Sequence, residues 1–130
     1  MKRIITVNDL YIAKEALSKL SSIKGYSNPT LINLVKNIKV INFLIITWDN
    51  AKINILEECV ERDEQNIPIQ VNGKWSIKDE VTYYNKIRSI LDNKIEMNIQ
   101  PMSLEDINLN GILTADILLS IDFLIKDFDD

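Results

Sequence analysis

The sequence predicts an α+β fold: a long central amphipathic helix with two or three shorter helices, a β-hairpin, and short flanking strands forming a small sheet. Three observations predict it. Apolar residues recur at helical spacing after Pro29, and no Gly or Pro follows until Pro68. An Asn-Gly pair lies between two alternating apolar runs, and short apolar strand-like runs flank the shorter helices. With 130 residues and 15.0 kDa, the chain is expected to form a single domain, residues 1–130.

The N-terminal part predicts a strand followed by a helix. Residues Arg3 to Val7 form a short β-branched run. Asp9 is expected to cap a first helix that ends near Gly25. Apolar residues fall on one face of that helix, at Leu10, Ala13, Leu17 and Leu20.

The long helix is expected from about residue 30 to residue 62. Asn28-Pro29 is a strong start signal, because Asn caps free amides and Pro at the first helical position has no amide proton to lose. A seam of positions then steps alternately by three and four, as in a coiled coil: Leu31, Leu34, Ile38, Ile41, Ile45, Trp48, Lys52, Ile55 and Cys59.

The length of this helix predicts self-association. At 1.5 Å per residue it would be roughly 50 Å long, whereas a compact domain of this size is only about 35–40 Å across. A homodimer or higher oligomer would cover the overhanging apolar seam. The expected subunit interface consists of Leu31, Leu34, Ile38, Ile41, Ile45, Trp48 and Ile55.

The second half of the chain predicts the hairpin, a strand and shorter helices. Asn72-Gly73 suits a type I′ turn between the runs around Val71 and Trp75. Ser76 with Asp79 resembles a capping box for a helix through Leu91. A strand over residues 95–99 ends at Pro101. Further caps are expected at Ser103 and Thr114, the latter before a helix with the stripe Ile117, Ile121, Leu124 and Phe128.

The composition argues against catalysis. The chain has no histidine, which removes the commonest general base and metal ligand, and its three glycines stand alone, so no phosphate-binding loop exists. Cys59 is the single cysteine and is expected to be buried. The carboxylates Glu57, Glu58, Glu61, Asp63 and Glu64 cluster at a helix C-terminus, where the helix dipole disfavours negative charge. We expect no enzyme activity, no cofactor and no metal.

Charge is distributed unevenly along the chain. Residues 1–39 contain seven basic and two acidic residues, whereas residues 40–130 contain eight basic and seventeen acidic residues. Such asymmetry is typical of ordinary solvated faces, and it also suits a partner surface or contact between copies. With three arginines in total and a pI near 4.9, nucleic-acid binding is not expected. An anionic ligand such as a nucleotide remains an alternative, through Lys14, Lys19, Lys36, Tyr11 and Tyr26.

The sequence predicts a soluble, cytoplasmic protein. The apolar run after Met1 is too short for a signal-peptide core. No stretch approaches the 18 uncharged apolar residues that predict a membrane span. Isoleucine, asparagine and lysine together supply 49 of the 130 residues, which indicates an AT-rich genome.

Four segments in order carry a resemblance: Leu34-Val35-Lys36-Asn37-Ile38, Glu61-Arg62-Asp63-Glu64, Val71-Asn72-Gly73-Lys74-Trp75-Ser76-Ile77, and Ile107-Asn108-Leu109-Asn110-Gly111. With them the chain resembles small uncharacterised proteins of phages and prophages in low-GC bacteria. The resemblance implies a phage accessory protein, and small non-enzymatic proteins of this kind commonly either bind and block a host defence component or assist virion assembly. The missing chemistry, the overlong apolar helix and the split charge favour a non-catalytic protein that binds a host protein and inhibits host defence. Two alternatives stay open: a virion or tail assembly component, and a protein that sequesters a nucleotide signal.

Overall fold

The computed structural model describes residues 1–126 and has the predicted mixed α+β fold. Its elements, in chain order, are β1 Lys2–Thr6, α1 Val7–Ser21, α2 Asn28–Cys59, β2 Gln70–Val71, β3 Lys74–Trp75, α3 Glu80–Leu91, β4 Lys94–Asn98, α4 Leu104–Ile107, the 3₁₀ turn Leu109–Gly111, α5 Ala115–Ile121 and the 3₁₀ turn Asp122–Leu124.

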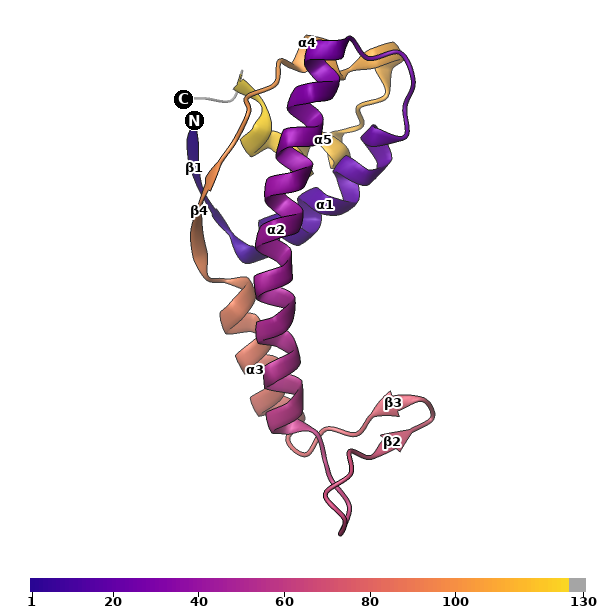
Figure 1. The fold of residues 1–130 in the computed structure, drawn as a ribbon, viewed down its shortest axis with the longest axis vertical. Helices are drawn as coiled ribbons and strands as arrows, with labels where there is room; N and C mark the ends of the chain where they lie inside the picture. The colour runs from indigo at the N-terminus through magenta and orange to yellow at the C-terminus, as the bar shows by residue number, and fades with distance from the viewer. Residues whose placement is uncertain (127–130) are drawn as a thin grey trace.

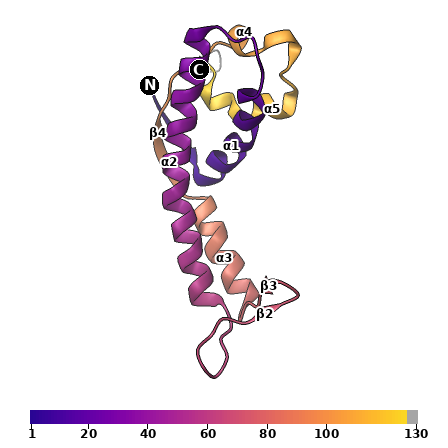
Figure 2. The ribbon, with the colours of Figure 1, turned by 45° about the vertical axis from the view of Figure 1, so that its right-hand side comes forward.

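The molecule is elongated and has two parts (Figure 1). The first, which we call the head, contains β1, β4, α1, α4, α5 and the N-terminal half of α2. The second, the stalk, is the C-terminal half of α2 with α3 alongside it, and it ends at the hairpin β2–β3 (Figures 1 and 2). The chain exposes 8669 Å², against about 7,000 Å² for a compact monomer of 15.0 kDa.

The helices begin at side chains that accept hydrogen bonds from free backbone amides. Thr6 caps α1, and Asp9 completes a capping box by accepting from the Thr6 amide. The expectation that Asp9 is the cap was therefore wrong by three residues. Ser27 caps α2, with Pro29 in its first turn as predicted. The helix ends at Cys59, three residues before the predicted end.

The caps of the later helices follow the same rule. Asp79 itself caps α3 by accepting from the Thr82 amide, so the predicted box starting at Ser76 was wrong. Ser103 and Thr114 cap α4 and α5, as predicted. The expected stripe position Phe128 lies outside the described residues.

The strands form two separate sheets of two antiparallel strands. β1 pairs with β4, with Ile4 opposite Glu96, and closes one side of the head. β2 pairs with β3 around Asn72 and Gly73, whose φ angles of 52° and 76° are those of the predicted type I′ turn. The hairpin is therefore independent of the flanking sheet.

The core of the head is built on the inner face of α2. Leu34, Ile41 and Ile45 are buried there, in one cluster with apolar residues of α1, β4 and α5. This corrects the expected subunit interface, because these three side chains are covered by their own chain and are unavailable to a second copy. The spacing predicted a buried face, and α1 provides the cover.

The remaining interface positions are partly covered as well. Ile38 and Trp48 are half-buried against the core cluster, and Ile55 is half-buried in the stalk, where α3 packs along α2. Leu31 is 37% exposed. Lys52, the charged position of the seam, lies 3.7 Å from the centroid of the Tyr11 ring. A cation over an aromatic face explains how a lysine is tolerated at this position.

Candidate protein-binding surface

The tip of the stalk is an ordered loop between α2 and the hairpin. Isolated β-bridges join Val60 to Ile77 and Arg62 to Pro68. The Asp63 carboxylate accepts hydrogen bonds from the amides of Gln65 and Ile67, at 2.9 and 3.0 Å. These bonds fix the loop before any partner arrives, which lowers the entropy cost of binding.

This loop and α2 enclose a groove, which we call the tip groove. It has a volume of about 460 Å³, within the range of ligand and side-chain pockets. Trp75 forms one wall and is 45% exposed. The full lining is Ile53, Leu56, Glu57, Val60, Arg62, Pro68 and Trp75. An apolar floor with a tryptophan and an arginine has the composition of a protein-interaction hot spot.

Of the predicted acidic cluster, Glu57 lines the tip groove. Glu57, Asp63 and Glu64 are exposed, and Glu61 is half-buried. Glu58 forms a salt bridge with Lys86 of α3 at 3.2 Å. Among residues 1–126, no three side chains of the metal-binding types come together. The groove lining thus carries one negative charge, on Glu57, and one positive charge, on Arg62, and each favours an opposite charge on a partner.

The residues predicted for an anionic ligand are only partly brought together. Tyr11, Lys14 and Lys19 border one open depression on α1, which Glu15 also lines. The Tyr11 hydroxyl donates to Asp49 at 2.6 Å. Burial, this hydrogen bond and the charge of Asp49 raise the pKa of Tyr11 above its ordinary value, so the hydroxyl stays protonated.

The other two predicted ligand residues lie elsewhere. Tyr26 is buried in the head, and its hydroxyl donates to the Ile107 carbonyl at 2.7 Å. Burial raises its pKa. Lys36 is exposed on α2 and lines neither the α1 depression nor the cavity between α1 and α2. The prediction was wrong for Tyr26, because a buried side chain with a backbone partner has no surface to offer a ligand.

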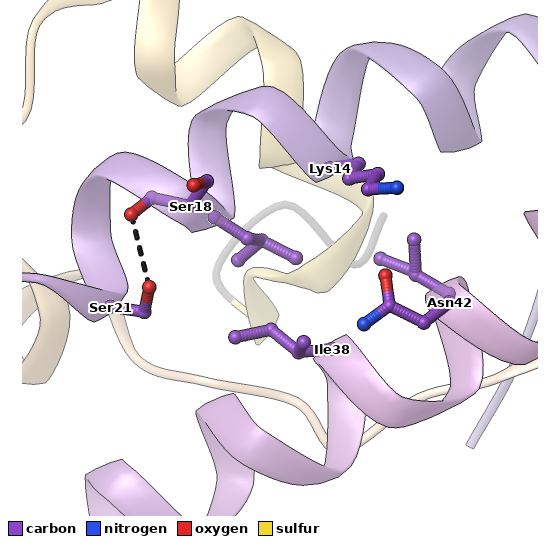
Figure 3. A pocket seen from close by; sticks show the side chains of 7 residues that line it. Lys14, Ser18, Ser21, Ile38 and Asn42 are labelled. Carbon is purple, nitrogen blue, oxygen red and sulfur yellow. Dashed lines mark hydrogen bonds between the residues drawn. The ribbon is translucent and has the colours of Figure 1, made fainter.

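A second cavity lies between α1 and α2 (Figure 3). Lys14 and Asn42 line one end of it, and Ser18 and Ser21 the other. The Ser21 hydroxyl donates to the Ser18 carbonyl. Its volume of about 170 Å³ is below the roughly 300 Å³ at which ligand pockets begin. The cavity is therefore too small for a nucleotide.

Helix α2 is also long and apolar enough to cross a membrane, judged by length and composition alone. The sequence was expected to hold no segment that could span a membrane, and α2 is an exception by this criterion. A core helix of a soluble protein passes the same test, and the inner face of α2 packs in the core of the head. The outer face of α2 remains uncovered in the described part of the chain.

Sequence reasoning missed the tip groove. Its walls, Ile53 and Trp75, are 22 positions apart, and the bridges at Val60 and Arg62 bring them together. The Asn-Gly turn was the only local signal. Comparison of the chain with protein-family models, with curated proteins and with solved structures finds no match.

Proposed function

We propose that this chain is a non-catalytic binding protein that acts by occupying a surface of another protein with its tip groove. The observation that carries the proposal is the exposed Trp75 over an apolar, preorganised groove. Hot-spot residues of this kind dominate the free energy of protein association.

The chemistry of the groove defines the partner. An apolar side chain of the partner inserts beside Trp75, and a Lys or Arg residue next to it faces Glu57. Opposite charges at the rim speed association and select the partner, and their effect weakens with salt.

Together with the resemblance to phage proteins, these features support the role of a cytoplasmic inhibitor of host defence, which binds a host protein. Enzymatic activity is not part of the proposal. Nor is a membrane function, because the core of the head uses the inner face of α2.

Phage plating tests the proposal. Defence-bearing bacteria would produce the wild-type chain, Trp75→Ala or Tyr84→Ala. Tyr84 is a matched control, because it is an exposed aromatic residue on α3 outside the groove. We expect the wild type and Tyr84→Ala to restore plating, and Trp75→Ala to lose the effect.

The same three proteins are then used in a pull-down from the protected host. A partner bound through the groove is retained by the wild type and Tyr84→Ala and is released by salt. Trp75→Ala loses about 2 kcal/mol or more of binding free energy, or roughly thirtyfold in affinity. Unchanged plating across a panel of defence systems, with no partner dependent on Trp75, refutes the proposal.

A further inference from the structure

The outer face of α2 is a second apolar surface, separate from the seam buried against α1 and α3. Its exposed apolar residues are Ile32, Val35, Phe43, Ile46 and Ile53, each between 47% and 71% exposed. Together they present on the order of 500 Å² of apolar surface, close to the largest patch on a typical monomer. Patches of this size are often functional.

Four of these residues, Ile32, Val35, Ile46 and Ile53, belong to a second heptad seam, and Phe43 lies beside it. Positions 32, 39, 46 and 53 repeat every seven residues, and positions 35, 42 and 49 lie between them at alternating steps of three and four. All seven side chains are exposed. Lys39, Asn42 and Asp49 are the polar members. A straight stripe of this period on a helix fits another helix with the same period.

We propose that the outer face of α2 binds the same face of a second copy of this chain, with the two helices antiparallel around a two-fold axis that passes midway between Asn42 and Ile46. In this register Val35 faces Ile53 of the second copy, Lys39 faces its Asp49, and Asn42 faces its Ile46. We call each facing pair of residues a layer. Two-fold symmetry makes each layer occur twice in the dimer.

Charge fixes the direction of the pairing. In a parallel pair, Lys39 would face its own copy and Asp49 would face its own copy, so both polar layers would be repulsive. In the antiparallel pair, both layers join a lysine to an aspartate. The hydrogen bond from Tyr11 to Oδ1 of Asp49 holds this carboxylate in place and leaves its second oxygen for the lysine.

The available area suits a stable dimer. Interfaces of standard size bury about 800 Å² on each partner. The apolar stripe with the polar layers beside it reaches that order, and the elongated chain exposes well over 1,000 Å² more than a compact monomer would. The stripe does not include Trp75, but it shares Ile53 with the tip groove. Neither Trp75→Ala nor Ile46→Asp changes this shared residue.

Size-exclusion chromatography with light scattering tests the dimer at about 100 µM, where an interface of micromolar Kd is mostly occupied. The wild type is expected at twice the 15.0 kDa chain mass. Ile46→Asp places two carboxylates in the centre of the interface, and we expect at least a hundredfold weaker dimer. Asn54→Asp is the control, because Asn54 is exposed on the same helix beside the stripe.

Charge exchange tests the direction. Lys39→Glu alone and Asp49→Lys alone each create repulsive layers, so each protein is expected to be monomeric. Their mixture restores two opposite-charge layers and is expected to form a heterodimer. Asp49→Lys also removes the hydrogen bond from Tyr11, so a second variant tests the antiparallel register without changing Asp49. A chain that carries both Val35→Cys and Ile53→Cys is expected to give a covalent dimer on mild oxidation.

Three results would overturn the proposal. The first is a wild-type monomer at this concentration. The second is a dimer that Ile46→Asp leaves intact, or a mixture of the charge variants that stays monomeric while the cysteine variant forms no cross-link. The third is flotation with lipid vesicles that Ile46→Asp abolishes in a monomeric protein, which would make a membrane the occupant of this face.

Discussion

Asn37 joins α2 to the segment after β4, and its removal tests how the head is held together. Its side chain is completely buried. Nδ2 donates to the Gln100 carbonyl at 2.9 Å, and Oδ1 accepts from the Gln100 amide at 2.8 Å. One side chain thus satisfies both backbone groups of a residue 63 positions away. We predict that Asn37→Ala destabilises the protein.

The magnitude follows from the groups left behind. An unsatisfied buried donor or acceptor costs about 1–3 kcal/mol, so two of them would cost roughly 2–6 kcal/mol. The side chain of Gln100 is exposed, so water reaches part of its backbone and reduces the cost. We therefore expect a loss of about 2–3 kcal/mol in the free energy of unfolding. Asn37→Asp should lose a similar amount, because it turns a carboxylate oxygen toward the Gln100 carbonyl.

Urea unfolding followed by circular dichroism measures this loss. All proteins are compared at one concentration, since self-association would add to the apparent stability. Asn54→Ala is the control, because it makes the same change at an exposed position of the same helix. If Asn37→Ala unfolds within about 0.5 kcal/mol of Asn54→Ala, the double hydrogen bond contributes little and the reasoning fails.

Two further predictions concern the loop after α1 and the pH dependence. Gly25 has φ of 108°, and an added Cβ would lie 3.0 Å from Leu109 Cδ2, so Gly25→Ala should cost about 1–3 kcal/mol of stability in the same urea assay. The pKa of Tyr11 is raised in the folded state above the ordinary value of 10.0. Its contribution to stability is therefore complete below pH 10 and is lost as the pH rises further. Wild type should lose more stability between pH 9 and pH 11 than Tyr11→Phe.

Each of these two predictions has a plain contrary result. For Gly25, a stability equal to that of Lys24→Ala, at the exposed neighbouring position, would show that neither the backbone angle nor the methyl contact matters. For Tyr11, identical losses in wild type and Tyr11→Phe between pH 9 and pH 11 would show that the hydrogen bond to Asp49 does not hold the proton.

Local chemistry made much of the fold predictable. The type I′ hairpin follows from Asn72-Gly73, because few other residue pairs adopt positive φ at both positions. The start of α2 follows from Pro29, and the starts of α4 and α5 from Ser103 and Thr114. The start of α1 was placed too late, since Asp9 has the properties of a cap but serves as the third residue of a box that Thr6 begins.

What covers a helix was not predictable from its spacing. The seam through Leu34, Ile41 and Ile45 correctly indicated a buried face, but apolar periodicity is the same whether the covering element belongs to the same chain or to another. Asn37 is part of that buried face and went unnoticed, because its two partners are backbone atoms of a distant residue. The tip groove depends on equally distant contacts.

The uneven distribution of charge along the chain is also present along α2. Lys36 and Lys39 lie in its N-terminal half, and Asp49 and Glu57 in its C-terminal half. An antiparallel pair of α2 helices would bring opposite halves together, and it would also place the two tip grooves at opposite ends of the dimer.

The two tip grooves of such a dimer bind more tightly to a target that presents two copies of the bound surface at a matching distance. A target with a single copy gains no affinity from the second groove. Ile46→Asp should therefore weaken inhibition of an oligomeric target strongly and of a monomeric target little, whereas Trp75→Ala should abolish both.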